Sequence, residues 1–159
     1  MPETHDVIIV GGGIAGSGLA TMLARGGKSV LLLEKSTEFA DVVRGEWMAP
    51  WGVIEAKRAG LYEVLLRAND YHIPRHIEYG DGLDPASGES RALSLALLPG
   101  VPGPLSVGHP QACQALIEAA AAAGATVVRG AVDVEPHCGE APSVAWTVSG
   151  ERHEARGRL

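Results

Sequence analysis

The sequence is poor in basic residues, aromatic residues and cysteine. Its 159 residues include 13 lysines and arginines against 19 aspartates and glutamates, which gives a net charge of −6, and aromatic residues make up 4%. Nucleic-acid-binding proteins usually carry a basic surface, so this balance argues against DNA or RNA as a partner. Hydrophobic residues make up 46% of the chain, which excludes disorder as a description of the whole chain and suits one domain of ordinary size.

The chain also lacks a long hydrophobic run and a basic leader segment. No apolar stretch approaches the ~20 residues needed to cross a bilayer, and the N-terminus has no basic segment typical of a secretory signal. Cys113 and Cys138 fit no metal-binding or redox spacing, and they indicate free thiols in a cytoplasmic protein. His72 and His76 are separated by a proline that excludes a shared helical face, so we expect no metal site.

The most informative feature present is a glycine-rich turn between an apolar segment and a helical pattern. Residues 5–10 read as a strand, and Gly-Gly-Gly-Ile-Ala-Gly follows at 11–16. Helical periodicity covers 14–25, and a second strand that ends in an acid is expected over 29–34. This order of elements is the dinucleotide-binding fingerprint, and it predicts the class of ligand from the sequence alone.

Each position of the glycine turn has a physical role in binding a pyrophosphate. Gly11 allows the tight turn, Gly13 lets the backbone approach the phosphates, and Gly16 lets the helix pack closely on the sheet. The helix N-terminus, at Ile14 and Ala15, directs unpaired N–H groups and the positive end of the helix dipole at the phosphates. We therefore expect this turn to contact the ligand.

An acidic residue at the end of the second strand marks the ribose-binding position. Glu34 follows Gly13 by 21 residues, close to the ~20 expected for this residue. Its carboxylate can accept hydrogen bonds from both ribose hydroxyls and would repel a 2′-phosphate, so NADP is disfavoured at this site. FAD and NAD both contain adenosine diphosphate, so the motif alone leaves the choice between them open.

The rest of the sequence predicts a long excursion, a further helix and strand, and an antiparallel meander. Shorter elements are expected within the excursion over 35–108, as helices at 51–59 and 61–68 and strands at 76–80 and 91–98. The alanine-rich segment 110–123 predicts a helix, and 125–129 a third parallel strand beside the second. The meander strands are expected at 131–135, 143–149 and 152–159. The chain thus divides into a strand–helix–strand unit 5–34, the excursion 35–108, a helix and strand 109–130, and a meander 131–159.

Four ordered features resemble the class A flavoprotein monooxygenases, the p-hydroxybenzoate hydroxylase-like family. They are the glycine turn with Glu34-Lys35, the loop 43–52 with Arg-Gly-Glu-Trp, the His-Pro-Gln start of the helix at 109–111, and the meander that ends in Arg-Gly-Arg-Leu. The resemblance implies an α/β fold, with a Rossmann-like FAD-binding sheet and an antiparallel β-meander. It implies FAD as cofactor, NAD(P)H as co-substrate, and hydroxylation of a small organic substrate, aromatic or polyketide-like.

The resemblance also implies roles for single residues in binding the cofactor. Arg44 would approach the FAD pyrophosphate or flavin, where its permanent charge suits phosphate oxygens. Gln111 would contact the ribityl–phosphate part, and the backbone of Val132 would touch the adenine. Lys35, beside Glu34, also belongs to the expected cofactor-binding set. No catalytic residue is identified.

The family pattern continues beyond residue 159, into further strands of the sheet and a substrate-binding domain. We therefore expect 1–159 to be a partial FAD-binding domain, inactive or nearly so by itself. Residues 7–10 would then form an exposed apolar sheet edge that favours self-association.

Two alternatives from other classes stay open. One is another FAD-dependent oxidoreductase, such as a halogenase or a geranylgeranyl-reductase-like enzyme. The other is a non-enzymatic nucleotide-binding module that pairs with a second chain. An NAD dehydrogenase is less favoured, because the Arg44 loop and the meander have no role in it.

Overall fold

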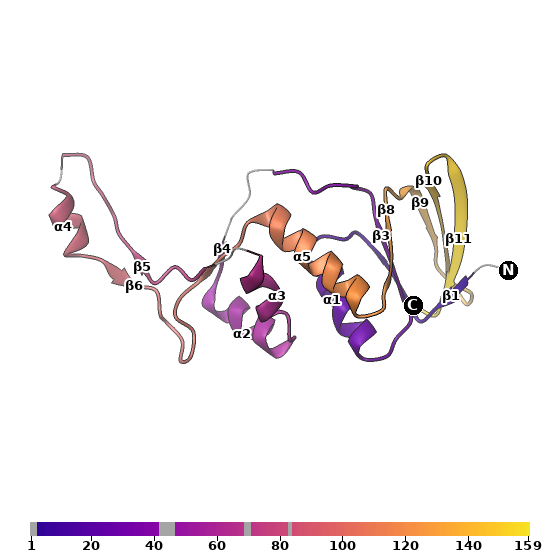
Figure 1. Cartoon of the computed structure of the whole chain (residues 1–159), viewed down its shortest axis with the longest axis horizontal. Coiled ribbons are helices and arrows are strands. Elements are labelled where there is room, and N and C mark those ends of the chain that lie inside the picture. Colours follow the sequence, from indigo (N-terminus) through magenta and orange to yellow (C-terminus); the bar gives the residue numbers. More distant parts are fainter. Residues whose placement is uncertain (1–2, 42–46, 69–70, 83) are drawn as a thin grey trace. The chain divides into compact units, whose positions relative to one another are not determined.

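The computed structural model describes residues 3–41, 47–68, 71–82 and 84–159. The chain divides into two units, drawn in sequence colours in Figure 1. The first unit combines residues 1–42 with 110–159, and the second consists of residues 43–109. The nucleotide-binding residues predicted from the fingerprint all belong to the first unit.

The first unit is built on the three parallel strands that the sequence predicts. β2 (Val7–Val10), β3 (Val30–Glu34) and β8 (Thr126–Arg129) form a sheet in the order β2-β3-β8. All five residues of β3 are buried, because both faces of this central, almost wholly apolar strand are covered. The third parallel strand therefore lies beside the second, as expected.

Two helices cover one face of the parallel sheet. α1 (Ile14–Arg25) and α5 (His109–Ala122) lie on the same side of β3 and β8 in Figure 1. The buried residues of this layer form one apolar cluster: Ile9, Ala20, Ala24, Val30, Leu32, Ile117, Ala120 and Ala125. Several of these are alanines, so the helices pack closely. The fully buried hydroxyl of Thr21 donates to the carbonyl of Ser17 at 2.7 Å and also lies 3.4 Å from the carbonyl of Leu116, so the two helices are in direct polar contact.

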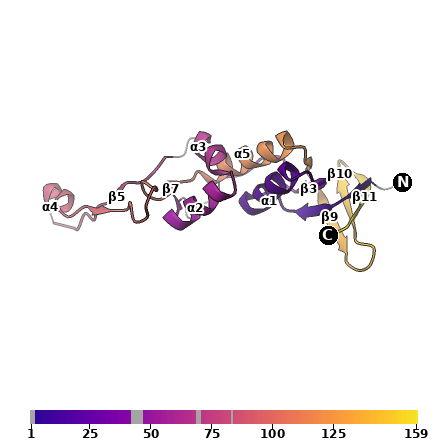
Figure 2. The same cartoon turned by 90° about the horizontal axis from the view of Figure 1, so that it is seen from below.

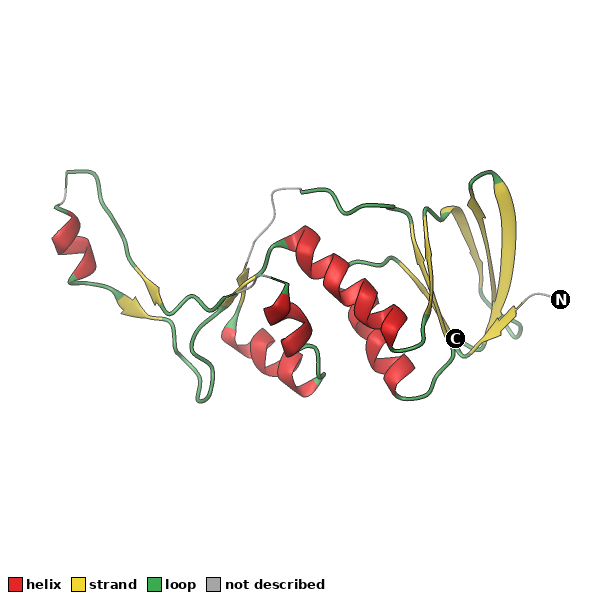
Figure 3. Ribbon diagram, viewed as in Figure 1, coloured by secondary structure: helices red, strands yellow, loops and turns green. Residues whose placement is uncertain are grey.

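A second sheet covers the opposite face. β9 (Val132–His137), β10 (Ser143–Val148) and β11 (Glu151–Gly157) form the predicted antiparallel meander, and β1 (Glu3–His5) adds a parallel strand beside β11. Its side chains meet the odd-numbered residues of β3 in a second cluster: Leu31, Leu33, Ala131, Val144, Trp146 and Ala155. The unit thus has three layers, helices, parallel sheet and meander, as Figure 3 shows. This architecture confirms the predicted α/β class.

The first predicted strand differs from the expectation, because residues 5–10 do not form one continuous strand. The chain leaves the meander sheet after His5 and enters the parallel sheet at Val7. Asp6 lies at this crossing, where its carboxylate accepts a hydrogen bond from the N–H of Ser29 at 3.0 Å and its own N–H donates to the Ser29 carbonyl at 2.8 Å. These bonds hold the crossing against the start of β3, so one N-terminal segment contributes a strand to each of the two sheets.

β2 lies at an edge of the parallel sheet. The N–H of Ile8 donates to the carbonyl of Leu159 at 3.0 Å, and the N–H of Leu159 donates to the carbonyl of Asp6 at 3.2 Å. Backbone N–H groups alternate sides along a strand, so the N–H of Val10 faces the same side as that of Ile8. The Val10 residue is 57% exposed, so the carboxyl half of this edge is open.

The second unit consists of short elements. α2 (Pro50–Arg58) and α3 (Tyr62–Arg67) correspond to the two helices expected there. Four two-residue strands pair antiparallel, as β4 (Trp47–Met48) with β7 (Leu105–Ser106) and β5 (Arg75–His76) with β6 (Leu93–Ser94). Figure 2 shows these elements from below.

Two features of the second unit differ from the sequence prediction. The strands expected at 76–80 and 91–98 are shorter than predicted. α4 (Pro85–Glu89) forms where a turn was expected, because the Asp84 carboxylate accepts hydrogen bonds from the N–H groups of Ala86 and Ser87, at 3.2 and 3.3 Å, and so caps a helix. Across both units, no helix in the described part of the chain is long and apolar enough to span a bilayer.

Candidate functional site: a nucleotide cradle

The candidate site lies at the carboxyl ends of β2 and β3, where the chain turns into α1. Gly11 has a φ of +103°, a conformation that favours glycine because it has no side chain. Its N–H donates to the carbonyl of Leu33 at 2.8 Å, so the turn continues the hydrogen bonding between the two strands. The tight turn that the sequence assigns to Gly11 is therefore present.

The glycines at 13 and 16 have different surroundings. A Cβ added at Gly16 would lie 1.8 Å from the carbonyl oxygen of Gly11, so a side chain there collides with the backbone of the turn. A Cβ added at Gly13 would meet nothing within 4 Å, and the φ of Gly13 is an ordinary −70°. Gly16 is thus required by packing. Gly13 faces open space, which is the space a phosphate would need.

The N-terminus of α1 has the character of an anion site. Gly13 is its N-cap, no side chain caps the helix there, and the first turn contains no acidic residue. The N–H groups at Ile14 and Ala15 lie in this first turn, and the positive end of the helix dipole adds to their attraction for a phosphate. The cradle therefore fits a pyrophosphate in shape and in charge.

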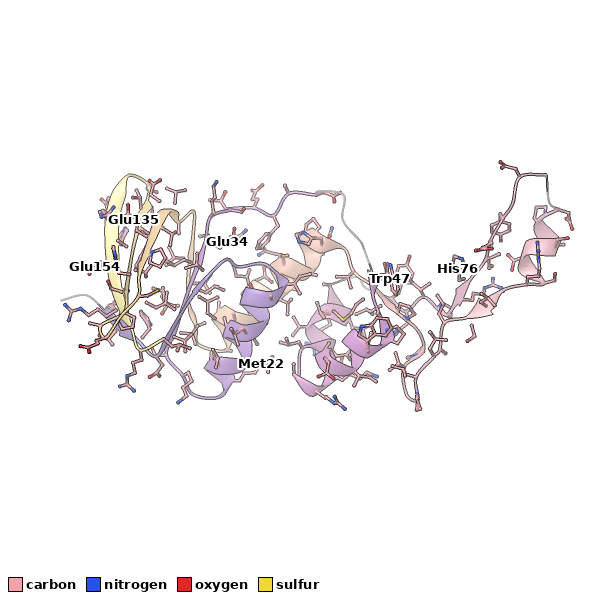
Figure 4. All side chains as sticks on the ribbon, turned by 180° about the vertical axis from the view of Figure 1, so that it is seen from behind. Met22, Glu34, Trp47, His76, Glu135 and Glu154 are labelled. Atoms are coloured by element: carbon pink, nitrogen blue, oxygen red, sulfur yellow. The ribbon has the colours of Figure 1, made fainter. Side chains whose placement is uncertain are left out.

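Glu34 connects the glycine turn to the end of β3. The residue is 8% exposed, and Figure 4 shows it among the side chains of the first unit. Its Oε2 accepts a hydrogen bond from the N–H of Gly12 at 2.5 Å, and its Oε1 accepts one from the N–H of Ser36 at 2.6 Å. Each carboxylate oxygen keeps a further lone pair, so Glu34 can brace the turn and still accept bonds from ribose hydroxyls.

The environment of Glu34 keeps its carboxyl group ionised. Burial alone would raise its pKa, but the hydrogen bonds from Ser36 and Gly12, together with the positive charge of Arg129, outweigh burial and lower the pKa below its ordinary value. A carboxylate stabilised in this way stays negative well into the acid range. It therefore remains a hydrogen-bond acceptor under all ordinary conditions.

Arg129, at the end of β8, is a supporting residue that the sequence analysis missed. Its Nε donates to the carbonyl of Ser36 at 3.0 Å, and its Nη1 donates to the side-chain oxygen of Gln114 at 2.8 Å. Its guanidinium also lies 4.6 Å from the centre of the Phe39 ring, a cation–π distance. Arg129 thus ties the loop after Glu34 to β8 and α5. An arginine ending an otherwise apolar strand is the signal that could have identified it.

A hollow of about 500 Å³ lies beside Glu34 and combines residues from three segments of the chain. Its lining consists of Val10, Gly11, Leu33, Glu34, Lys35, Ala131, Val132, Asp133 and Val134. Four of the predicted cofactor-binding residues are in this group. Residues 131, 133 and 134 were not predicted, because their approach to β3 depends on how β9 leaves the parallel sheet.

The predicted residue Gln111 is not part of the hollow. Gln111 is exposed in the first turn of α5. Arg44 lies outside the described residues. Among the residues that are described, no group of histidine, cysteine, aspartate and glutamate could hold a metal ion.

The fold and the cradle define a dinucleotide-binding domain of the Rossmann type. Comparison with known families identifies it further: residues 4–159 match the family of FAD binding domains, and the chain belongs to this family. The match covers nearly the whole chain. It confirms FAD as the nucleotide, which the fingerprint alone left open.

Individual relatives are similar over part of the chain. Squalene monooxygenase from Rattus norvegicus is 35% identical over 72 residues, which are 45% of this chain and 13% of the relative. Squalene epoxidase from Aspergillus fumigatus is 43% identical over 60 residues, 38% of this chain and 12% of the relative. The matched region is thus a small part of these proteins.

Solved structures share the fold over nearly the whole chain. p-Nitrophenol 4-monooxygenase from Pseudomonas putida has a TM-score of 0.78 at 18% identity, over 99% of this chain and 40% of that structure. A myxobacterial chondrochloren halogenase has a TM-score of 0.75 at 25% identity, over 99% of this chain and 36% of that structure. The chain therefore spans well under half the length of these flavoproteins.

Replacing Gly13 by alanine should weaken FAD binding without destabilising the protein. The added methyl group meets no protein atom, but it occupies the approach to the helix N-terminus, so we expect the Kd for FAD to rise about tenfold or more. A flavin fluorescence titration measures the Kd for FAD, and a thermal melt of the same variant measures its stability.

Gly16→Ala is the matched comparison, because its methyl group collides with the Gly11 carbonyl. We expect it to lower the free energy of unfolding by about 3 kcal/mol or more. Equal effects of the two variants on melting temperature would contradict the separate roles of these glycines.

The stability of the protein should depend on pH through Glu34. Because its pKa is lower in the folded state, Glu34 stabilises the fold fully above its unfolded pKa, and this contribution is lost as the pH falls through the folded pKa. Glu34→Gln should cost about 1–3 kcal/mol at pH 7, typical of hydrogen bonds to a charged group. The difference in the free energy of unfolding between the wild type and Glu34→Gln should become smaller at acid pH.

Denaturant titrations of wild type and Glu34→Gln at neutral and acid pH measure this difference. Glu38→Gln, in the exposed loop after β3, serves as the control and should follow the wild type. If the wild type and Glu34→Gln had the same free energy of unfolding at both pH values, Glu34 would not stabilise the turn.

Proposed function

We propose that this chain is the adenosine-diphosphate-binding part of an FAD-dependent, NAD(P)H-using monooxygenase of class A, similar to p-hydroxybenzoate hydroxylase. The observation that carries the proposal is the joint geometry of Gly13 and Glu34, an open helix N-terminus beside a buried carboxylate, within an FAD binding domain. The relatives named as monooxygenases and hydroxylases support the reaction class.

Each part of the cradle has a proposed partner on FAD. The turn from Gly11 to Gly16 binds the pyrophosphate, Glu34 accepts hydrogen bonds from the ribose diol, and Lys35 and the backbone of Val132 contact the adenine. Glu34 keeps its position through Gly12 and Ser36, so the ribose meets a preorganised acceptor.

The flavin end of the cofactor is held by fewer of the residues in this chain. Gln111, in the first turn of α5, contacts the ribityl–phosphate part, and Arg44 contacts the pyrophosphate or flavin. When bound, the flavin supplies the chemistry, taking a hydride from NAD(P)H and activating oxygen, while the protein positions it. The substrate is a small organic molecule, aromatic or polyketide-like. Structures with a similar fold include a p-nitrophenol monooxygenase and aklavinone-11 hydroxylase.

Two alternatives differ in reaction or in class. A halogenase shares the fold at 25% identity and a geranylgeranyl bacteriochlorophyll reductase-like protein at 24%, so another FAD-dependent oxidoreductase is the second candidate. A non-enzymatic nucleotide-binding module that pairs with a second chain is the third. We also propose a cytoplasmic setting, since Cys113 is buried, Cys138 is exposed, and neither is in a disulfide.

Titration of the purified chain with FAD tests the proposed function. We expect quenching of flavin fluorescence, a shifted visible spectrum, and competition by ADP, because the cradle binds the adenosine diphosphate part. NAD(P)H consumption should stay near background. No spectral change with FAD in large excess would refute FAD binding by this chain, and binding that ADP does not displace would refute the assignment of the cradle.

We infer that a second copy of the chain pairs with the open edge of β2. The edge presents the apolar run 7–10, and beyond the bonds to Leu159 the N–H of Val10 faces outward. An exposed apolar edge strand is a template for pairing with another strand. A second copy offers an identical edge, so two β2 strands can complete each other.

Light scattering over a wide concentration range tests this pairing. We expect the wild type to self-associate as concentration rises, and Val10→Lys to stay monomeric, since a charge on an edge strand opposes pairing. Met22→Lys is the control: Met22, labelled in Figure 4, is likewise an apolar residue that is 46% exposed, and it belongs to α1 and not to β2. A monodisperse wild-type monomer at all concentrations would contradict the inference.

A further inference from the structure

Asp133 has a backbone conformation that aspartate seldom adopts. Its φ is +49°, and in the described part of the chain the one other non-glycine residue with a positive φ is Ser149, at +53°. Ser149 is explained by its turn: with Gly150 it forms the two-residue connection between β10 and β11, a hairpin type that needs positive φ at both positions. Asp133 lies within β9, where no such turn requires it.

The pairing of β9 with β10 shows what this conformation does. Glu135 pairs with Ala145 and Val132 pairs with Thr147, so Asp133 and Val134 both lie opposite Trp146. This is a β-bulge, with one extra residue on β9, and a bulge redirects the side chains near it. A left-handed residue at such a bulge is usually glycine. An aspartate in this conformation lowers the stability of the fold, and such strained residues often have a functional role.

The position of the bulge supplies that reason. Asp133 is exposed and lines the hollow beside Glu34, together with Lys35 and Val132. If Glu34 holds the ribose and the turn at Gly13 holds the phosphates, the base lies farther along, against residues 131–134. The strained residue thus borders the space that the base would fill.

We propose that the carboxylate of Asp133 recognises the base, by accepting a hydrogen bond from the exocyclic amino group of adenine. A 6-oxopurine presents a carbonyl oxygen at this point, which cannot donate and repels a carboxylate. Asp133 therefore selects adenine over hypoxanthine or guanine. This role rests on the proposed function, since it assigns the base-binding part of the same cradle.

Calorimetric titration with ADP and with IDP tests the role of Asp133. The two nucleotides differ at the 6-position of the base, and we expect the wild type to bind ADP at least about tenfold tighter, as a hydrogen bond to a charged group implies. Asp133→Asn tolerates the left-handed conformation and has an amide that donates as well as accepts. It should bring the two affinities within about threefold of each other.

Asp133→Gly and Ser149→Gly form a matched pair that separates strain from recognition. Both substitutions place glycine at a positive φ, so both should raise the melting temperature. Asp133→Gly should lose about tenfold in ADP affinity and should bind IDP at least as tightly as the wild type, because the repulsion between the carboxylate and the 6-oxo group is removed. Ser149→Gly, outside the hollow, should keep the wild-type preference for ADP.

The outcomes distinguish this inference from the proposed function. A wild type that binds neither nucleotide refutes the cradle itself, and base recognition with it. A wild type that binds ADP and IDP equally, or an ADP preference that persists in both Asp133 variants, leaves the nucleotide site intact and overturns the role of Asp133.

Discussion

The carboxylate of Glu34 is the interaction on which the nucleotide cradle depends. It accepts hydrogen bonds from the glycine turn at Gly12 and from the loop after β3 at Ser36, and so joins two segments that the sequence separates. Arg129 fixes the same loop from a third strand and from α5. The binding surface is therefore organised around a buried charge, and a ligand need not create that order itself.

The features predictable from the sequence are those that local patterns determine. The glycine turn, Glu34 and the helices at α1 and α5 have signals within a few residues, because turns, caps and helical periodicity are short-range. The FAD binding family match and the three-layer fold agree with them. The roles of Arg44 and Gln111 stay predictions, carried by the resemblance alone.

The features missed depend on partners far apart along the chain. The split at Asp6 follows from the different sheets that its two sides join, and the contact of Arg129 with Ser36 spans 93 residues. The bulge at Asp133 is visible only in its register with Trp146. A local sequence pattern does not contain such register, so the place of residues 133 and 134 beside Glu34 could be found only from the structure.

The pairing of β1 with β11 has a consequence for the way the protein is made. Glu3, Thr4 and His5 pair with Ala155, Arg156 and Gly157, so each pair joins residues that are 152 positions apart in the sequence. During synthesis β1 leaves the ribosome before β11 and must wait until residues 152 positions further along the sequence have been made before its neighbour exists. Such non-local pairing slows folding. The meander sheet therefore gains its fourth strand, β1, only after translation has passed β11.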